Sequence, residues 1–326
     1  MNLSSRPSYS RAPVRSFSTL ASTFGVTEAQ LGRLVEKASS MYRRPQRRAV
    51  KKDGTLRDTW DALPQLKALQ ELINKRFLRQ IIFPHFLQGG IRDLASPRDY
   101  VRHVGFHAGA ACAIVLDIAD FFPSITEVQV YSVWQGFFRF SADVAQALTK
   151  LTTKDGFLPQ GAKTSNYLAN LVFWRDEHSL VHRLKTLGWR YSRLTDDVVV
   201  SKATPSTHGE ETRICRLVAG FIQAQGFVVN RRKLKINRQC RCMELNGLVA
   251  NAHPALPKAE RNAIRAQVHG LKRHLAHPQC LDTSAARSTL GRLGKLKRLH
   301  EKEGKALRAT LPDNVERLLG QARVSP

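Results

Sequence analysis

The chain has 326 residues, with 52 Lys and Arg against 26 Asp and Glu, which gives a formal net charge of +26. A surplus of this size exceeds the needs of solubility and points to a polyanionic partner, nucleic acid before an anionic membrane. A hydrophobic content of 42% excludes wholesale disorder, and the longest apolar stretch, Ala108–Leu116, is only about half a bilayer span.

The first 26 residues are predicted to form a flexible basic arm. Residues 1–60 hold 12 Lys and Arg against 4 acids, and Met1–Leu20 contains no Asp or Glu. The same composition is typical of an organellar transit peptide, which stays open as the alternative. This segment has no apolar core of the secretory kind, and five cysteines, an odd number, indicate a reducing cytosol.

The next segments have mainly helical patterns. Thr27–Tyr42 carries apolar residues at helical spacing, with Thr27 as the N-cap. Lys51–Arg57, KKDGTLR, contains an Asp-Gly turn between basic flanks and predicts the tip of a hairpin. Leu66–Phe86 has an apolar period that predicts a helix ending at Pro84.

Two strand patterns end or begin at carboxylates. Ala113–Leu116 predicts a short buried strand that runs into Asp117. Arg190–Leu194 and Val198–Ser201 are β-rich runs that predict a hairpin. Its turn would consist of Thr195-Asp196-Asp197.

The C-terminal third becomes helical after a last strand pattern. Ile214–Gln225 predicts a helix and Gly226–Asn230 predicts a strand, and two helices with apolar stripes are expected beyond Pro257. The stripes consist of Ile264, Val268, Leu271 and Leu275, and of Leu290, Leu293, Leu296 and Leu299. Residues 231–326 hold 21 Lys and Arg against 7 acids, which fits a grip on a polyanion.

The acidic residues Asp117, Asp196 and Asp197 form the candidate catalytic group. Asp117 follows a buried strand, where an unpaired carboxylate is costly, and the Asp196-Asp197 pair stands at a hairpin turn 79 residues later. Carboxylates with phosphate oxygens and water are the ligands that Mg²⁺ prefers. A two-ion site of this kind serves nucleotidyl transfer. The alternative for the pair alone is ordinary surface turn chemistry.

Four segments, taken in order, resemble the motifs of reverse transcriptases. They are VLDIADFFPSI (115–125), LPQGAKTSNYLANL (158–171), YSRLTDDVVVS (191–201) and GFVVNRRKLKI (226–236). Within that family, the FFPSI run and GLVAN (247–251) resemble the bacterial retron type. The resemblance implies an α+β right-hand polymerase fold with fingers, an antiparallel-sheet palm and a helical thumb.

The resemblance also implies a division of the chain. After the arm at 1–26, the fingers would comprise 27–112 with part of 126–165, the palm 113–250 and the basic helical thumb 251–326. A bacterial cytoplasmic location goes with this family.

By resemblance, Asp117, Asp196 and Asp197 would hold two catalytic Mg²⁺, with Mn²⁺ as a substitute, and the carbonyl of Ile118 would be a further ligand. Phe122, beside Phe121, would select deoxyribonucleotides by a clash with a 2′-hydroxyl. Its alternative is core packing.

Further substrate contacts are implied around these carboxylates. Gln160 and Gly161 would lie along the template and the incoming nucleotide. The triphosphate and pyrophosphate would be held by basic residues, for which exposed basic turns are the alternative. These residues are Lys51, Lys52, Arg57 and Lys233.

RNA contacts are expected at His107 and along the basic C-terminal helices, which would follow an A-form duplex. The helix residues are Arg265, Lys272, Arg273, Lys295, Lys297 and Arg298. The retron resemblance further implies a structured noncoding RNA template, priming from a guanosine 2′-hydroxyl, a branched RNA–DNA product, and an accessory effector protein in anti-phage defence. Nothing in the sequence indicates the oligomeric state.

Three alternatives stay open at this point. HVGFH (103–107) keeps only His107 of the retron Asn-Ala-x-x-His, and Leu245-Asn246-Gly247 keeps only the Gly of the retron Val-Thr-Gly. These departures favour a defence-associated reverse transcriptase outside the retrons, and an enzyme similar to group II intron proteins is the second alternative. The third alternative, a catalytically silent RNA-binding scaffold, predicts the loss of a catalytic Asp, whereas all three are present.

Overall fold

The structure is a computed structural model that describes residues 5–46, 50, 54–238, 242–275, 282–315 and 317. The chain forms two compact units. The first comprises residues 1–107 and 111–237, and the second comprises 108–110 and 238–326. Among the described residues, none of the helices combines the length and apolar character needed to cross a membrane.

A four-stranded sheet forms the base of the first unit, with the order β4-β5-β3-β6. The strands are β3 (Cys112–Asp117), β4 (Arg190–Leu194), β5 (Asp197–Lys202) and β6 (Lys235–Arg238). The central strand β5 is antiparallel to both β3 and β4. Its run of Val residues is buried on both faces, as a strand covered by helices on each side requires.

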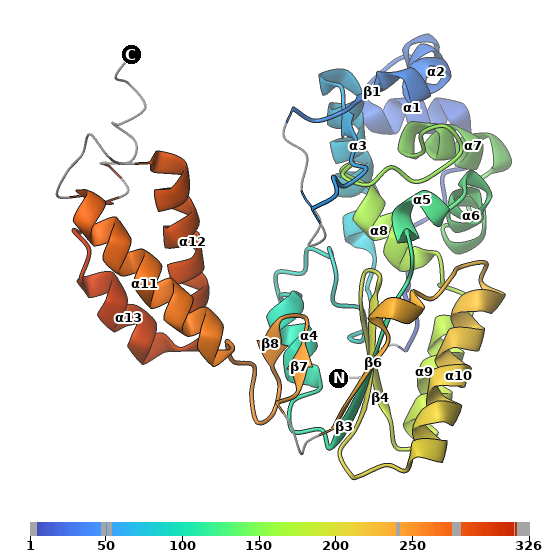
Figure 1. The fold of residues 1–326 in the computed structure, drawn as a ribbon. Helices are drawn as coiled ribbons and strands as arrows, with labels where there is room; N and C mark the ends of the chain where they lie inside the picture. Colours follow the sequence, from blue (N-terminus) through green and yellow to red (C-terminus); the bar gives the residue numbers. More distant parts are fainter. Residues whose placement is uncertain are drawn as a thin grey trace. The chain divides into compact units, whose positions relative to one another are not determined.

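Helices cover this sheet on two sides (Figure 1). One face carries α9 (Glu177–Thr186) and α10 (His208–Ala224), and the other carries α4 (Tyr100–Phe106). The capping side chains of Thr207 and Asp99 accept hydrogen bonds from the first turns of α10 and α4.

The remaining helices of the first unit pack together beyond one end of the sheet, the end at which β3 leads into α5 (Figure 1). They are α1 (Phe17–Phe24), α2 (Glu28–Lys37), α3 (Pro64–Arg76), α5 (Phe121–Ser124), α6 (Glu127–Ser132), α7 (Ala142–Thr152) and α8 (Ser165–Leu171). Short helical turns are η1 (Ala38–Met41), η2 (Leu78–Gln80), the π-helical η3 (Val133–Phe137) and η4 (Arg231–Lys233). An aromatic cluster around the fully buried Trp134, stacked on Phe138 and Phe140, joins these helices.

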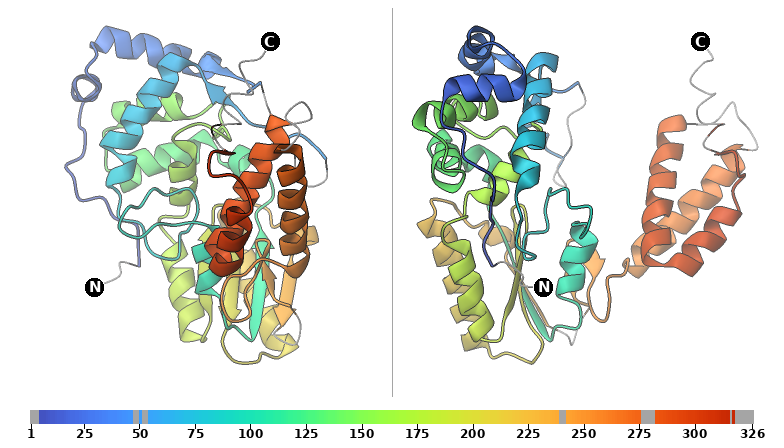
Figure 2. Two further views of the ribbon diagram at one scale, coloured as in Figure 1. Left: turned by 90° about the vertical axis from the view of Figure 1, so that its left-hand side faces the viewer. Right: turned by 180° about the vertical axis from the view of Figure 1, so that it is seen from behind.

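Two further strands, β1 (Tyr42–Arg43) and β2 (Asp61–Ala62), pair beside α3. The N-terminal segment runs from α1 along the back of the first unit (Figure 2, right). It is fixed there because Ser8 and Ile82 exchange two backbone hydrogen bonds of 3.0 Å.

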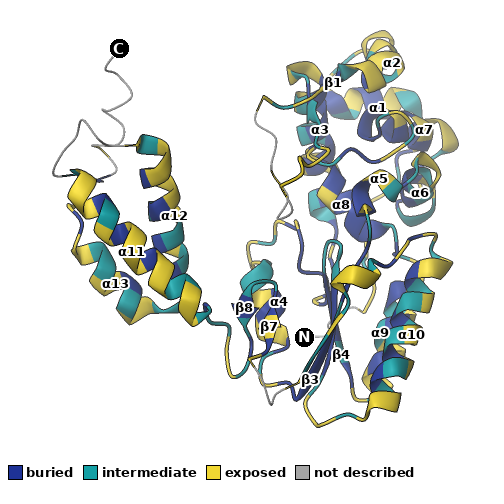
Figure 3. Ribbon diagram, in the orientation of Figure 1, coloured by how far each residue is buried: buried dark blue, intermediate teal, exposed yellow. Residues whose placement is uncertain are grey.

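In its described residues, the second unit contains a short hairpin and three helices. The hairpin is β7 (Glu244–Leu245) with β8 (Leu248–Val249), and the helices are α11 (Lys258–Leu275), α12 (Thr283–Leu299) and α13 (Glu301–Ala309). Ile264, Val268 and Leu271 of α11 are buried, whereas other positions of the helix are exposed (Figure 3). The exposed positions of α11 include Lys272 and Arg273.

Most predicted elements are present with altered limits. Thr27 caps α2 through a capping box, and the Asp hairpin forms as β4–β5. The helix expected up to Pro84 ends at Arg76, because the chain turns there into η2 and buries apolar side chains at irregular spacing. The strand expected at Gly226–Asn230 is wrong: Val229 makes only one bridge, to Ile118, and the strand lies at Lys235–Arg238.

Candidate active site

The sheet brings the three candidate carboxylates to one place. Asp117 ends β3 directly opposite Asp197, which begins the antiparallel β5. The next backbone contact lies one residue further along, where the Ile118 amide donates to the Asp196 carbonyl at 3.1 Å. The pairing of β3 with β5 therefore brings together carboxylates that are 79 residues apart in the sequence.

The turn that carries Asp196 has an uncommon backbone. Thr195 lies in the left-handed region at φ 61°, which costs free energy for a β-branched residue. Gly89 approaches this turn so closely that a Cβ there would lie 2.5 Å from the Thr195 amide nitrogen. Only glycine permits this contact, and we expect the neighbouring segment to hold the turn in place.

A buried ion pair supports the same turn from within the core. The Arg193 side chain is fully buried, donates to Glu177 Oε1 at 2.6 Å and Oε2 at 2.9 Å, and donates to the Thr195 carbonyl at 2.9 Å. Tyr191 donates to Glu177 at 2.7 Å. Sequence reasoning missed Arg193 and Glu177; the signal was an arginine inside a buried strand, where a charge needs a partner.

The charges at the site act on one another. Lys233 Nζ donates to Asp117 Oδ1 at 2.8 Å, and this bond, with the other Asp residues, raises the pKa of Lys233. Burial raises the pKa of Asp196, and the negative charge of Asp117 raises it further, against the opposing charges of Lys233 and Arg57. Mutual repulsion of carboxylates in a half-buried site is what a bound cation relieves.

The three carboxylates are of the kind that a divalent-cation site needs. Asp117, Asp196 and Asp197 supply the oxygen ligands that Mg²⁺ prefers, at the end of a rigid strand pair. In the part of the chain that the structure describes, no group of three or more Asp, Glu, His or Cys side chains is arranged to hold a metal ion. Instead, the ammonium of Lys233 neutralises Asp117.

The segment around Gly161 packs against the segment before β2. The Trp60 amide donates to the Gln160 carbonyl at 2.8 Å. Gly161 has φ 107°, and a Cβ there would lie 2.8 Å from the Trp60 carbonyl oxygen, so glycine is required twice over. Arg57 is exposed and close enough to lower the pKa of Asp196, whereas Lys51 and Lys52 lie outside the described residues.

Comparison with known proteins identifies the family. Residues 50–251 match the family described as "Reverse transcriptase (RNA-dependent DNA polymerase)". The retron Se72 reverse transcriptase of Salmonella heidelberg (strain 579083-10) is 32% identical over 276 residues, which cover 83% of this chain and 72% of that protein. This chain belongs to the retron-type reverse transcriptases. It is therefore an RNA-directed DNA polymerase with the right-hand polymerase fold, and its family uses divalent metal ions.

Other similarities are more distant. The retron Ec48 reverse transcriptase of Escherichia coli is 30% identical over 310 residues, 90% of this chain and 75% of that protein. Among solved structures, apo telomerase from Candida tropicalis, truncated from its C-terminal domain, has a TM-score of 0.42 at 10% identity. That alignment covers 71% of this chain and 61% of the telomerase chain.

The two phenylalanines of the reverse transcriptase motif differ in their surroundings. Phe121 packs between Phe173 and Phe227, with ring centroids at 5.9 and 5.2 Å, and is a core residue. Phe122, five residues after Asp117, is also buried in the hydrophobic core, with 8% of its surface exposed, and touches Phe121 by its edge. A nucleotide contact thus remains a prediction for Phe122, while the position of Phe121 favours packing.

The candidate RNA contacts also separate into two groups. His107 is fully buried, with its ring nitrogens 2.7 Å from the hydroxyls of Ser192 and Ser201, so its side chain is not open to RNA as the resemblance implied. It instead joins α4 to β4 and β5. Burial lowers the pKa of His107, followed by the charges of His103 and Arg190.

On the second unit, Arg265 binds Glu303 at 2.6 Å and Lys295 binds Glu260 at 3.1 Å, so both link helices. The other basic candidates are exposed on α11 and α12. These are Lys272, Arg273, Lys297 and Arg298.

Proposed function

We propose that this reverse transcriptase copies a cognate structured noncoding RNA and starts synthesis from the 2′-hydroxyl of a guanosine in that RNA. The product would be a branched RNA–DNA molecule, msDNA. The observation that carries the proposal is the pairing of Asp117 with Asp197 beside Asp196, in a chain whose curated relatives are named retron reverse transcriptases. An accessory effector protein and a role in anti-phage defence belong to the same proposal and rest on this kinship.

The chemistry is transfer of a nucleotidyl group. The hydroxyl oxygen attacks the α-phosphorus of a deoxynucleoside triphosphate, the bond to the bridging oxygen breaks, and pyrophosphate leaves. Asp117, Asp196, Asp197 and the Ile118 carbonyl would hold two Mg²⁺, with Mn²⁺ as a substitute. When bound, such ions supply activation of the attacking hydroxyl and neutralise the developing charge.

The protein's own side chains would do the rest. Lys233 carries a proton within reach of the site, and we assign the transfer of this proton to the departing pyrophosphate. Arg57 would bind the triphosphate, since a guanidinium grips phosphate bidentately. Phe122 would close the space that a ribonucleotide's 2′-hydroxyl needs.

The same proposal gives each region a role. Residues 27–112 with part of 126–165 act as fingers, 113–250 as the palm and 251–326 as the thumb. The exposed Lys272, Arg273, Lys297 and Arg298 would bind backbone phosphates of the RNA–DNA duplex. Gln160 and Gly161 would border the template.

The test is to express the protein from its own locus, purify it, and digest the copurifying nucleic acid separately with RNase A and DNase. We expect a discrete species that DNase degrades and RNase shortens, and a debranching enzyme should release its RNA end. The same preparation from an Asp196→Asn strain should contain RNA alone. A linear cDNA with an ordinary 3′-primed end would contradict the proposal.

A further inference from the structure

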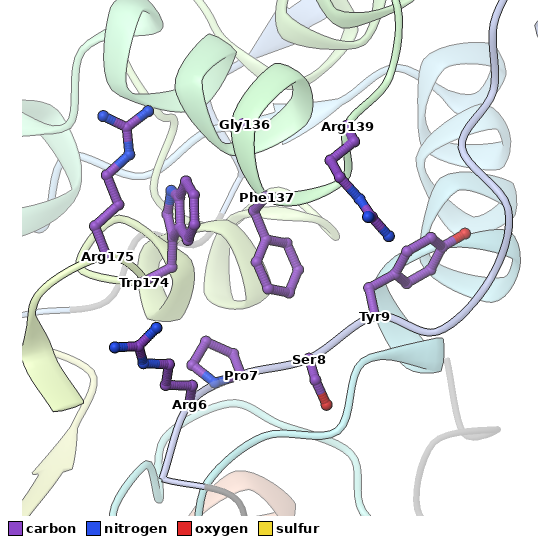
Figure 4. Close-up of a pocket in the computed structure, with 9 residues that line it drawn as sticks. All are labelled: Arg6, Pro7, Ser8, Tyr9, Gly136, Phe137, Arg139, Trp174 and Arg175. Carbon is purple, nitrogen blue, oxygen red and sulfur yellow. The ribbon is translucent and has the colours of Figure 1, made fainter.

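A pocket lies on the first unit, lined by segments that do not carry the catalytic carboxylates (Figure 4). Its volume is about 370 Å³, within the range of pockets that hold small ligands. The N-terminal segment, η3 with the loop after it, and the turn between α8 and α9 form its walls. The lining residues are Arg6, Pro7, Ser8, Tyr9, Gly136, Phe137, Arg139, Trp174 and Arg175.

The walls are shaped by irregular backbone. Gly136 lies in the π-helical turn η3, and a Cβ there would lie 2.9 Å from Trp174 Cζ2, so glycine lets the indole ring approach the helix. Arg139 has φ 59°, a left-handed conformation that is uncommon outside glycine. Both π-turns and such outliers concentrate at functional sites.

The charge of the pocket has one sign. Arg6, Arg139 and Arg175 are exposed at its rim, and no lining residue is acidic. The nearby Asp176 accepts a hydrogen bond from Gln225 at 3.1 Å. The pKa of the neighbouring His178 is lowered by burial and, to a smaller extent, by the positive charge of Arg6. The negative charge of Asp176 acts in the opposite direction. The site therefore favours an anion.

Aromatic faces lie among these cations. Figure 4 shows the rings of Trp174, Phe137 and Tyr9 bordering the hollow, with the Arg139 side chain between Phe137 and Tyr9. The Arg175 guanidinium lies 5.0 Å above the Trp174 ring and donates to the Ser132 hydroxyl at 3.2 Å. Aromatic and guanidinium planes stack on nucleobases, and guanidinium groups bind phosphate.

We propose that this pocket binds an unpaired nucleotide of single-stranded RNA, with the base against Trp174 and the flanking phosphates on Arg6 and Arg139. The proposal deepens the proposed function, on which it rests: a structured RNA template contains unpaired segments that need a holding site away from the catalytic carboxylates. A duplex does not fit this role, because its bases are stacked inside the helix, where Trp174 could not stack on their faces.

The pocket is separated from the catalytic site by the core. Phe173 turns inward to Phe121 and lies under the Arg193 guanidinium at 4.9 Å, whereas the next residue, Trp174, lines the pocket. RNA bound there would be anchored to the protein without occupying the catalytic site.

The experiment is photocrosslinking of the full-length protein to a single-stranded oligonucleotide of twelve 4-thiouridines, followed by peptide mass spectrometry. We expect a uridine adduct on Trp174 or Tyr9. An excess of free UMP should leave the adduct in place; its loss to UMP would assign a free-nucleotide site and overturn the proposal. If no lining residue carried an adduct, the proposal would also be overturned. That result is expected if the pocket instead binds an acidic peptide.

Affinity for the same oligonucleotide gives a second readout. Trp174→Ala should weaken binding about fivefold to a hundredfold and Trp174→Phe much less, because stacking survives. Arg139→Gln should lower the slope of log affinity against log salt by about 0.7, whereas Arg213→Gln, a matched loss of charge on exposed α10, should leave it unchanged. Equal effects of the two Arg variants would contradict the proposal.

Primer extension on poly(rA) with oligo(dT) is measured on the same preparation. The oligonucleotide carries no retron sequence, so its crosslinking does not depend on the cognate RNA. An active preparation without a pocket adduct would therefore reject RNA binding in the pocket and leave the proposed function standing. Conversely, a pocket adduct in a protein that makes no branched product supports the pocket and rejects the proposed priming.

Discussion

Arg193 binds both carboxylate oxygens of Glu177 inside the core, at 2.6 and 2.9 Å. A buried ion pair adds little stability over apolar residues of the same size, because both charges lose their hydration. Arg193 also donates to the Thr195 carbonyl at 2.9 Å, one residue before the Asp pair. The ion pair is therefore best understood as a support that fixes the turn carrying Asp196.

Removing one partner of this pair leaves a buried charge. Glu177→Gln or Arg193→Met should lower the free energy of unfolding by about 3–5 kcal/mol, as measured by urea denaturation. The double variant Arg193→Met/Glu177→Leu should recover most of the stability but little primer extension, because Thr195 loses its donor. Full activity of the double variant would show that the turn does not depend on Arg193.

Asp196→Asn should abolish primer extension, because it removes a negatively charged oxygen from the proposed cation site. Affinity for RNA, measured by fluorescence anisotropy, should stay within about twofold, since no phosphate contact is lost. Glu127→Gln, on the exposed first turn of α6, serves as the matched control and should retain activity. Loss of RNA binding by Asp196→Asn would count against the assigned role.

The stability of the metal-free protein should depend on the Asp196 charge. Its pKa lies above the ordinary 3.8, so between the two values the folded state binds more protons than the unfolded state. The free energy of unfolding therefore falls as pH rises through that window. In EDTA at pH 7, Asp196→Asn should melt at a higher temperature than wild type, and the gain should vanish below pH 3.8; a gain independent of pH would refute this origin.

Phe122→Ala should raise incorporation of ribonucleotides relative to deoxyribonucleotides by at least tenfold in single-nucleotide extension. The smaller side chain removes the proposed clash with the 2′-hydroxyl. Phe121→Ala is the comparison: it should leave selectivity unchanged while it destabilises the fold by about 3–5 kcal/mol, as large-to-small core substitutions do. Unchanged selectivity in Phe122→Ala would reject the gate.

Gly161→Ala tests the contact between the PQG segment and Trp60. A Cβ would meet the Trp60 carbonyl oxygen at 2.8 Å, and φ 107° is unfavourable for alanine. We expect a loss of about 1–3 kcal/mol in stability and a larger rise in KM for the nucleotide than fall in kcat. Gly209→Ala in α10, where a Cβ meets nothing, is the control.

Local elements were largely predictable from the sequence. The capping box at Thr27, the Asp hairpin, and the two stripes of the C-terminal helices depend on short-range patterns that determine hydrogen bonding and amphipathicity. The long apolar segment after Leu66 was misjudged as one helix, since burial in an irregular loop leaves the same hydrophobic composition as burial in a helix.

The candidate site residues and the family could be inferred from the sequence, because motifs of several consecutive residues carry both. The contact partner of each of these residues became visible in the folded chain alone. The fold placed Asp117 opposite Asp197, buried His107 between two serines, and paired Arg193 with Glu177. Such contacts join residues far apart in the chain, and their free energy depends on burial and on the surrounding charges, which no local pattern encodes.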